Sequence, residues 1–216
     1  MSTRAAEEVR ALGFRLASAL LQYPDAELAA ASGEIEAAAR ELPDPSRTAV
    51  GRFLAHAART PMTALQQEYV RSFDFQKRAS LYLTFHLHGD QRKRGPALLR
   101  LKRLYAAAGF PHAGGELPDF LPGILEFAAV AAPEHGALVL DELRPAFELV
   151  RRAARDLASP YADVLDAVAG LMPPATREQI EAARRIAAEG PPMEEVGVEP
   201  FAPLDVMPPL ETGADR

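Results

Sequence analysis

Apolar residues recur at helical spacing from the first positions of the chain. Val9, Leu12, Leu16, Leu20 and Tyr23 follow one another at intervals of three or four residues, which places them on one face of a helix. A proline follows directly, and proline cannot continue a helix. The pattern therefore predicts a first helix that ends before residue 24.

Similar apolar stripes, with prolines between them, predict further helices along the chain. We expect these helices over about 25–41, 44–59, 61 onward, 96–108, 116–132, 133–157, 161–171 and 176–189. In the 116–132 helix, Pro118 is expected in the first turn, with Asp119 beside the positive end of the helix dipole. Pro145 is expected to bend the long 133–157 helix.

The segment Ser80–His88 could form either a strand or a helix. Leu81, Leu83, Phe85 and Leu87 alternate with other residues, as in a strand. No second strand is evident for it to pair with, and an unpaired strand would leave backbone groups unsatisfied. We therefore expect a buried helix here, and a single all-α globular domain of about nine helices over residues 1–188.

The charge of the chain is unevenly distributed. The 216 residues carry a net charge of −6, yet residues 1–188 contain 23 basic and 23 acidic groups. Residues 189–216 hold seven acids, one base and six prolines, without sustained periodicity. We expect this acidic, Pro-rich tail to be disordered.

Composition excludes several classes of protein. The chain has no cysteine, so it has no disulfide, zinc–thiolate site, iron–sulfur cluster or thiol nucleophile. No apolar run approaches the roughly 20 residues of a transmembrane helix, and the charged N-terminus does not resemble a secretory signal. We expect a cytoplasmic protein without direct membrane insertion.

Catalytic and metal-binding motifs are also missing. The sequence has no nucleophile elbow, phosphate-binding loop, dinucleotide fingerprint or H-E-x-x-H, and no Glu is followed by His three residues later. His86 and His88 are close in sequence, but positions i and i+2 of a helix point about 200° apart. We expect neither an enzyme nor a resident metal.

Three stretches in the middle of the chain combine aromatic and charged residues. Tyr69 and Phe73 share a helix face; residues 86–96 form a turn rich in basic side chains; residues 116–122 form a rigid acidic turn. Each stretch has a plain structural explanation, as core aromatics, a solvated turn and a helix start. Their combination suggests a binding groove.

The basic residues also allow a second hypothesis. Nine of the residues between Arg71 and Arg103 are Lys or Arg, and only Asp74 and Asp90 oppose them. Such a segment could serve a regulator that binds nucleic acid. The overall acidity and the lack of a known reading motif argue against this, so we expect no nucleic-acid partner.

The same three stretches, together with the opening LLQYPD at residues 20–25, resemble one protein family. The first runs from Tyr69 through Phe73 to Asp74, and the middle one runs from Ser80-Leu81 through His86-x-His88-Gly-Asp-x-Arg-x-Arg94-Gly. The third reads Glu116-Leu-Pro-Asp-x-Leu-Pro-x-x-Leu125-Glu-Phe127. In order and spacing, residues 10–170 are similar to the NarJ-type assembly chaperones of respiratory nitrate reductase, within the wider TorD-like group.

The resemblance implies a non-catalytic, all-helical chaperone. Its client would be the molybdenum-containing catalytic subunit of a membrane-bound nitrate reductase, bound through the N-terminal peptide while the molybdenum cofactor is inserted and before membrane attachment. Direct contact with the cofactor would be transient, and proteins that make the cofactor are further candidate partners. A related molybdenum oxidoreductase is the alternative client. No function is transferred to the tail.

The motif residues are the candidates for client-peptide contact. Aromatic and aliphatic members could supply apolar contacts, and the charged members could fix register by charge-assisted hydrogen bonds. The predicted set is Tyr69, Phe73, Tyr82, His86, His88, Asp90, Arg92, Arg94, Glu116, Pro118, Asp119, Leu121, Leu125 and Phe127. Some of these residues could instead hold the helices together.

Overall fold

The computed structural model describes residues 2–89, 91–112 and 114–190, and these residues form twelve α-helices and one short 3₁₀ helix. The helices are α1 (Thr3–Leu20), α2 (Ala26–Ala30), α3 (Ser32–Ala39), α4 (Ser46–Ala57), α5 (Met62–Phe73), η1 (Lys77–Ala79), α6 (Leu83–His88), α7 (Arg94–Ala107), α8 (Leu121–Val130), α9 (Pro133–Glu142), α10 (Arg144–Asp156), α11 (Tyr161–Leu171) and α12 (Arg177–Glu189). The all-α prediction is confirmed, with more helices than the expected nine.

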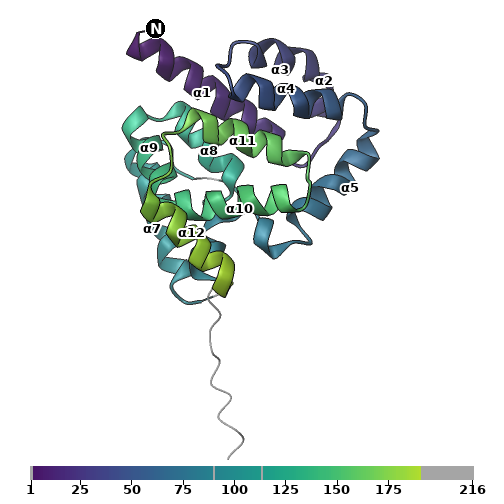
Figure 1. The fold of residues 1–216 in the computed structure, drawn as a ribbon. Helices are drawn as coiled ribbons and strands as arrows, with labels where there is room; N and C mark the ends of the chain where they lie inside the picture. The colour runs from purple at the N-terminus through teal and green to yellow at the C-terminus, as the bar shows by residue number, and fades with distance from the viewer. Residues whose placement is uncertain (1, 90, 113, 191–216) are drawn as a thin grey trace, which may run out of the picture.

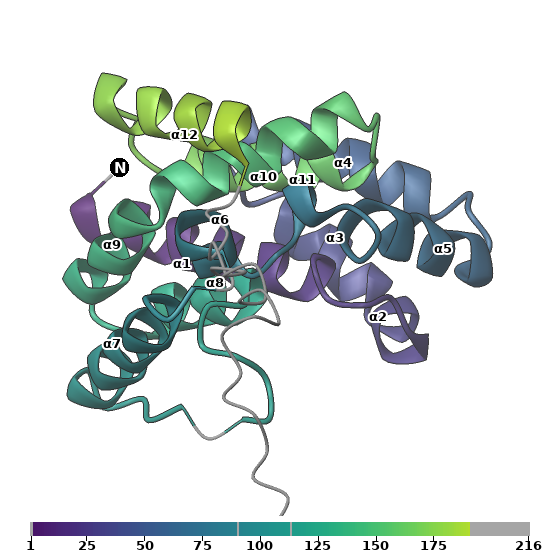
Figure 2. The ribbon, with the colours of Figure 1, turned by 90° about the horizontal axis from the view of Figure 1, so that it is seen from below.

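The helices are arranged around α1, α8 and α11. Helix α1 packs against both α8 and α11, while α11 also packs against α4, and α8 against α9. Helix α10 contacts α12 and the short α6. In Figures 1 and 2, α2–α5 lie toward one end of the molecule and α7 and α9 toward the other.

One hydrophobic core joins these helices. Its centre includes Leu121, Val164 and Leu165, none of which has exposed surface. Two buried hydroxyls connect neighbouring helices: Ser18 Oγ donates to the Pro122 carbonyl at 2.9 Å, and Ser46 Oγ donates to the Ala167 carbonyl at 2.8 Å. Because both hydroxyls have a partner, they are buried without the cost of an unsatisfied polar group.

Two of the predicted helices are divided in the structure. The 25–41 segment forms α2 and α3, separated at Ala31, just before the weak helix formers Ser32 and Gly33. The 133–157 segment is not one bent helix, because α9 ends before Leu143 and α10 begins at Arg144. Pro145 lies in the first turn of α10, where its missing N–H is not needed.

The prediction for the 116–132 helix was wrong about its start. Helix α8 begins at Leu121, and Pro122 rather than Pro118 occupies its first turn. Either proline would be suited to the first turn of a helix. The start of α8 is decided by Leu121, whose N–H donates to the Leu81 carbonyl at 2.8 Å and so ends an extended segment there.

The 80–88 segment is only partly helical. Residues 80–82 are extended, and the helix α6 covers the rest. Tyr82 forms an isolated antiparallel bridge with Phe120, which lies in a segment whose pattern predicts a helix. The sequence pattern disfavours a strand here because no second strand is evident to pair with it. The segment around Phe120 supplies those backbone partners.

Within the residues that the structure describes, no helix combines the length and apolar character that a membrane crossing requires. The predicted disordered tail lies almost entirely outside those residues, and so does the candidate Asp90.

Candidate functional site

Aromatic and acidic side chains surround a cavity of about 310 Å³, which we call the motif groove. It lies where the chain leaving α1 meets the C-terminus of α5, the extended 80–82 segment and the turn that precedes α8. Its lining residues are Gln22, Tyr23, Tyr69, Phe73, Asp74, Ser80, Leu81, Tyr82, Glu116 and Phe120. All three stretches singled out in the sequence contribute either to this lining or to its support.

The wall of the motif groove is a pair of short extended segments. The Leu83 N–H donates to the Asp119 carbonyl at 3.0 Å, and the Leu121 N–H donates to the Leu81 carbonyl at 2.8 Å. These two bonds flank the bridge between Tyr82 and Phe120. The second and third motifs therefore lie against each other, although Tyr82 and Phe120 are 38 residues apart in the sequence.

Side-chain contacts extend this wall toward the solvent. The Tyr82 and Phe120 rings are 5.3 Å apart between centroids, and the Tyr82 hydroxyl donates to Glu116 Oε1 at 2.8 Å. The Glu116 carbonyl is 2.7 Å from His112 Nε2. The exposed Glu116 carboxylate is thus held at the rim by the Tyr82 hydroxyl of the opposite motif, and its backbone carbonyl by His112 of its own turn.

The floor of the groove is aromatic. Tyr69 makes edge-to-face contacts with Tyr23 at 5.6 Å and with Phe73 at 5.1 Å between centroids. Its hydroxyl donates to the Leu21 carbonyl at 3.1 Å. Tyr69 and Phe73 are almost fully buried, whereas Tyr23 is 50% exposed. The accessible aromatic surface is therefore provided by Tyr23, Tyr82 and Phe120.

A buried acid supports the wall from behind. Asp119 has no exposed surface, and its Oδ2 accepts from the Thr84 N–H at 3.1 Å and from the Thr84 hydroxyl at 2.5 Å. Arg94 Nη2 lies 3.5 Å from the same oxygen. Asp119 therefore caps the N-terminus of α6, which is distant in sequence. The sequence pattern instead predicts Asp119 at the start of the helix that follows it along the chain.

The two neighbouring histidines have different surroundings. His86 is fully buried, and its Nε2 lies 2.8 Å from the Ser80 carbonyl. Burial lowers the pKa of His86 below the ordinary value of 6.5, so the ring is neutral at pH 7. Desolvation also lowers the pKa of the half-buried His88, with a contribution from the charge of Lys93.

The structure brings together only some of the predicted contact residues. Tyr69, Phe73, Tyr82 and Glu116 line the motif groove. Six others are buried behind it or in the core: His86, Pro118, Asp119, Leu121, Leu125 and Phe127. Three others lie outside the lining: His88 at the end of α6, Arg92 in the turn before α7, and Arg94 at the start of α7.

Several lining residues are absent from the predicted set. Tyr23 and Gln22 belong to the opening stretch that carries the family resemblance, and Asp74 is the last residue of the first motif. Phe120 lies at a position that the third motif does not specify. The local signals are therefore present, but nothing in helical periodicity joins residue 23 to residue 120.

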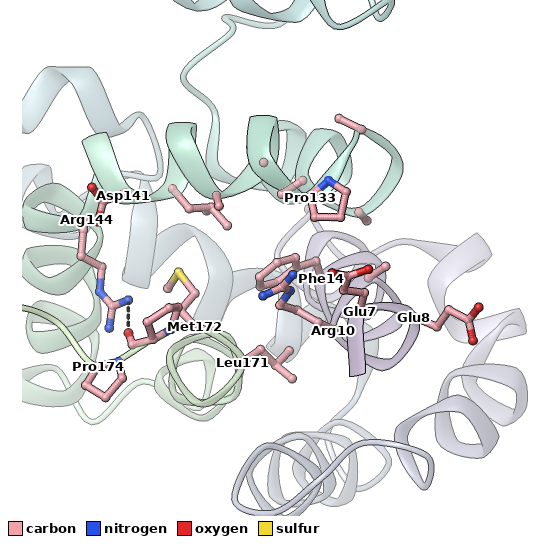
Figure 3. A pocket seen from close by; sticks show the side chains of 18 of the residues that line it. Glu7, Glu8, Arg10, Phe14, Pro133, Asp141, Arg144, Leu171, Met172 and Pro174 are labelled. Atoms are coloured by element: carbon pink, nitrogen blue, oxygen red, sulfur yellow. Dashed lines mark hydrogen bonds between the residues drawn. The ribbon is translucent and has the colours of Figure 1, made fainter. Parts of the chain in front are cut away.

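A second cavity, of about 470 Å³, lies between α1, the α8–α9 turn and the loop from α11 to α12; we call it the apolar pocket. Alanines line much of it, with Phe14, Leu140 and Met172. Figure 3 shows Arg144 and Asp141 at one end and Glu7, Glu8 and Arg10 toward the other. Arg144 Nη1 donates to the Pro173 carbonyl at 3.0 Å. No sequence motif indicated this pocket.

The sequence also raises two further questions, about metal-ligating groups and about the basic 71–103 segment. No group of three or more His, Cys, Asp or Glu in the described part of the chain is arranged to hold a metal. In the basic 71–103 segment, Arg100 Nη2 is 3.0 Å from Glu142 Oε2, and Arg94 contacts Asp119. Part of that basic charge is therefore neutralised within the fold.

The sequence pattern around the motif groove matches a known family. The family model for the nitrate reductase delta subunit matches residues 11–167, which include every lining residue of the groove. The chain belongs to the nitrate reductase delta subunit family. The resemblance noted in the sequence is therefore confirmed.

Individual relatives agree with this membership of the delta subunit family. The chain is 37% identical over 177 residues to the "Probable nitrate reductase molybdenum cofactor assembly chaperone NarJ" of Bacillus subtilis, covering 81% of this chain and 96% of that protein. It is 36% identical over 156 residues to the "Nitrate reductase-like protein NarX" of Mycobacterium tuberculosis, covering 72% of this chain but spanning only 23% of that longer protein.

A solved structure supports the fold. A crystal structure from Archaeoglobus fulgidus, provisionally described as a redox enzyme maturation protein, superposes with a TM-score of 0.53. The match covers 78% of this chain and 92% of that one, at 22% sequence identity. At this identity the likeness establishes the helical architecture alone.

Proposed function

We propose that this chain is a cytoplasmic assembly chaperone, and not an enzyme, for a respiratory nitrate reductase. It binds the N-terminal segment of the molybdenum-containing catalytic subunit, assists insertion of the molybdenum cofactor, and releases the subunit for membrane attachment. The family match and the name of the Bacillus subtilis relative support the assignment to reductase assembly. The peptide-binding step is our own inference.

One observation carries that inference: the family motifs converge on an open groove. The two motifs are joined by backbone hydrogen bonds, and the resulting wall faces the aromatic floor on α5. Exposed Tyr23, Asp74 and Glu116 lie at its rim. A cavity of about 310 Å³ accommodates a few side chains of a short segment and is much smaller than a globular interface.

The client segment would become ordered when it binds. Ordering a flexible peptide consumes part of the interaction free energy, so we expect a dissociation constant on the micromolar scale. The chaperone would carry no resident cofactor, and any contact with the molybdenum cofactor or with the proteins that make it would last only through loading.

Isothermal titration calorimetry with a synthetic N-terminal peptide of the catalytic subunit tests the proposal. We expect binding to the full chain, and about tenfold weaker binding by Tyr23→Ala, which removes half-exposed aromatic surface from the groove. Leu138→Ala is the matched control, because Leu138 is 48% exposed and lies outside both cavities.

Two results would contradict this assignment of the groove. The peptide could fail to bind at high micromolar concentration, or the two variants could weaken it equally. Thermal melts of both variants would show whether the protein remains folded. If only Tyr23→Ala loses peptide affinity, and its melting temperature is unchanged, the result supports the groove as the peptide-binding site.

The alternative client is a related molybdenum oxidoreductase. The groove does not distinguish between such clients, because the same lining can accept similar peptides. Identification of the catalytic subunit that co-purifies with the chain from its own cells decides between them. Recovery of another molybdenum enzyme in place of nitrate reductase would change the client and leave the binding site in place.

A further inference from the structure

The lining of the motif groove combines aromatic and acidic side chains. Five of them are aromatic, two are carboxylates, and none of those described is Lys, Arg or His. The basic motif residues that the sequence suggests for orienting a peptide, such as Arg94, lie outside the lining. The groove is therefore an aromatic cavity with a negatively charged rim.

Both rim carboxylates keep oxygen atoms available. Glu116 Oε1 accepts from the Tyr82 hydroxyl and from the Leu117 N–H at 3.1 Å, while Oε2 accepts no hydrogen bond from the described residues. The Asp74 side chain is exposed, and no hydrogen bond or ion pair joins it to another of the residues that the structure describes. Each carboxylate can therefore accept further donors from a ligand.

Asp74 stands where a helix disfavours an acid. It is the C-cap residue of α5, and its N–H donates to the Val70 carbonyl at 3.0 Å. Because the C-terminal end of a helix carries partial negative charge, a carboxylate there is destabilising rather than stabilising. The helix end and the two acids thus add to the same negative potential, which a positively charged ligand would relieve.

The phenols in the groove respond to this potential. Burial, assisted by the hydrogen bond and the charge of Glu116, raises the pKa of Tyr82 to about 12. Burial also raises the pKa of Tyr69, and the charges of Asp74 and Glu116 contribute in the same direction. The charges of the rim acids therefore act on both phenols in the same direction as burial, which is the larger cause.

We infer that Asp74 and Glu116 select a cationic side chain, Lys or Arg, in the client segment that the groove binds. The aliphatic stem would lie against the rings of Tyr23, Tyr82 and Phe120, and the charged group would meet the two carboxylates. This inference rests on the proposed function and adds the chemical class that the site recognises. Arg would gain most, because its planar guanidinium can donate two hydrogen bonds to one carboxylate.

The test pairs variants of the chaperone with variants of the peptide. The double variant Asp74→Asn with Glu116→Gln removes both charges and keeps an amide oxygen that can accept from Tyr82. Glu134→Gln on α9 is the control, because Glu134 is exposed and lies outside the groove. In the peptide, each Lys and Arg is replaced by Gln in turn, and calorimetry measures every combination.

We expect the double variant to bind the natural peptide about tenfold more weakly, and Glu134→Gln to bind it normally. One peptide position should lose about the same factor when Gln replaces the cation. That replacement should have little further effect on the double variant, because the two changes remove one interaction. Additive losses, or unchanged affinity, would overturn the inference while leaving peptide binding intact.

A second probe decides the inference even if the client peptide does not bind. Hexylguanidinium is titrated into the full chain and compared with hexanol, while NMR follows the ring protons of Tyr23, Tyr82 and Phe120. We expect ring shifts with hexylguanidinium that the double variant loses. Equal shifts with hexanol, or none with either probe, would contradict selection by charge. A peptide that fails to bind would count against the proposed function alone.

Discussion

The motif groove and the apolar pocket are built in different ways. The groove takes its shape from directional bonds, in which the Tyr82–Phe120 bridge and the Asp119–Thr84 contacts hold two loop segments together. The apolar pocket is shaped by packing between α1, α8 and α9, with alanines along its sides. The side-chain contacts of Asp119 need a particular residue type, whereas the backbone bonds do not and many apolar residues can fill similar space. Only the groove therefore carries a recognisable motif.

The largest expected effect comes from removing the buried acid behind the groove. Asp119→Ala should lower the free energy of unfolding by about 3 kcal/mol, because it leaves the N-terminus of α6 uncapped and removes the carboxylate that lies 3.5 Å from Arg94 Nη2. Urea denaturation measures this loss. Asp119→Asn should lose less, since one amide oxygen can still accept from the Thr84 N–H.

If Asp119→Ala lost less than about 1 kcal/mol of unfolding free energy, the contrast between the groove and the apolar pocket would fail, because the groove would then not depend on this bond network. Hydrogen exchange adds spatial detail. We expect amides of α6 to lose protection first, while amides of α8 and α9 beside the apolar pocket keep theirs.

The sequence revealed helices more readily than their connections. The stripe from Val9 to Tyr23 and the prolines located most elements, because an amphipathic face repeats locally. Neither Pro118 nor Pro122 has a local advantage as the start of α8. The backbone bond from Leu121 to Leu81 decides between them, and no local pattern encodes that pairing.

The same reason explains which parts of the site could be predicted. Tyr69 and Phe73 share a helix face, so their spacing indicated an aromatic floor. Asp119 was expected near a helix start, but the helix that it caps is one that begins at residue 83. Tyr23 completes the groove from a distant segment. Recognising its role required the tertiary arrangement.

An intermediate loss of stability is expected at Gly136, where α8 and α9 pack closely because glycine has no side chain. A Cβ on Gly136 would lie 2.8 Å from Ala128 Cα, so Gly136→Ala should force α8 and α9 apart and destabilise the protein by about 2 kcal/mol. Gly123→Ala on α8 is the control, because a Cβ at that position would meet no neighbouring atom within 4 Å. It should be neutral or slightly stabilising.

Thermal and urea denaturation of the two glycine variants test the packing of the pocket. Client-peptide affinity should stay unchanged in both, because the groove is separate. If Gly136→Ala weakened the peptide as much as Tyr23→Ala does, the two cavities would have to be regarded as one coupled site.

The smallest effect is a pH dependence that separates the two regions. Burial lowers the pKa of His86 below 6.5, so the unfolded chain binds more protons than the folded one as the pH falls through that value. Stability is therefore fully present above pH 6.5 and decreases below it, with a slope of at most about 1.4 kcal/mol per pH unit from this group. His86→Gln should flatten the share of the stability profile that this group contributes between pH 7 and 5. Since the His86 ring contacts the Ser80 carbonyl, amide protection factors at pH 5.5 should fall in residues 80–88 before they fall around the apolar pocket. An equal fall in both regions would mean that acid acts through the whole fold and not through His86.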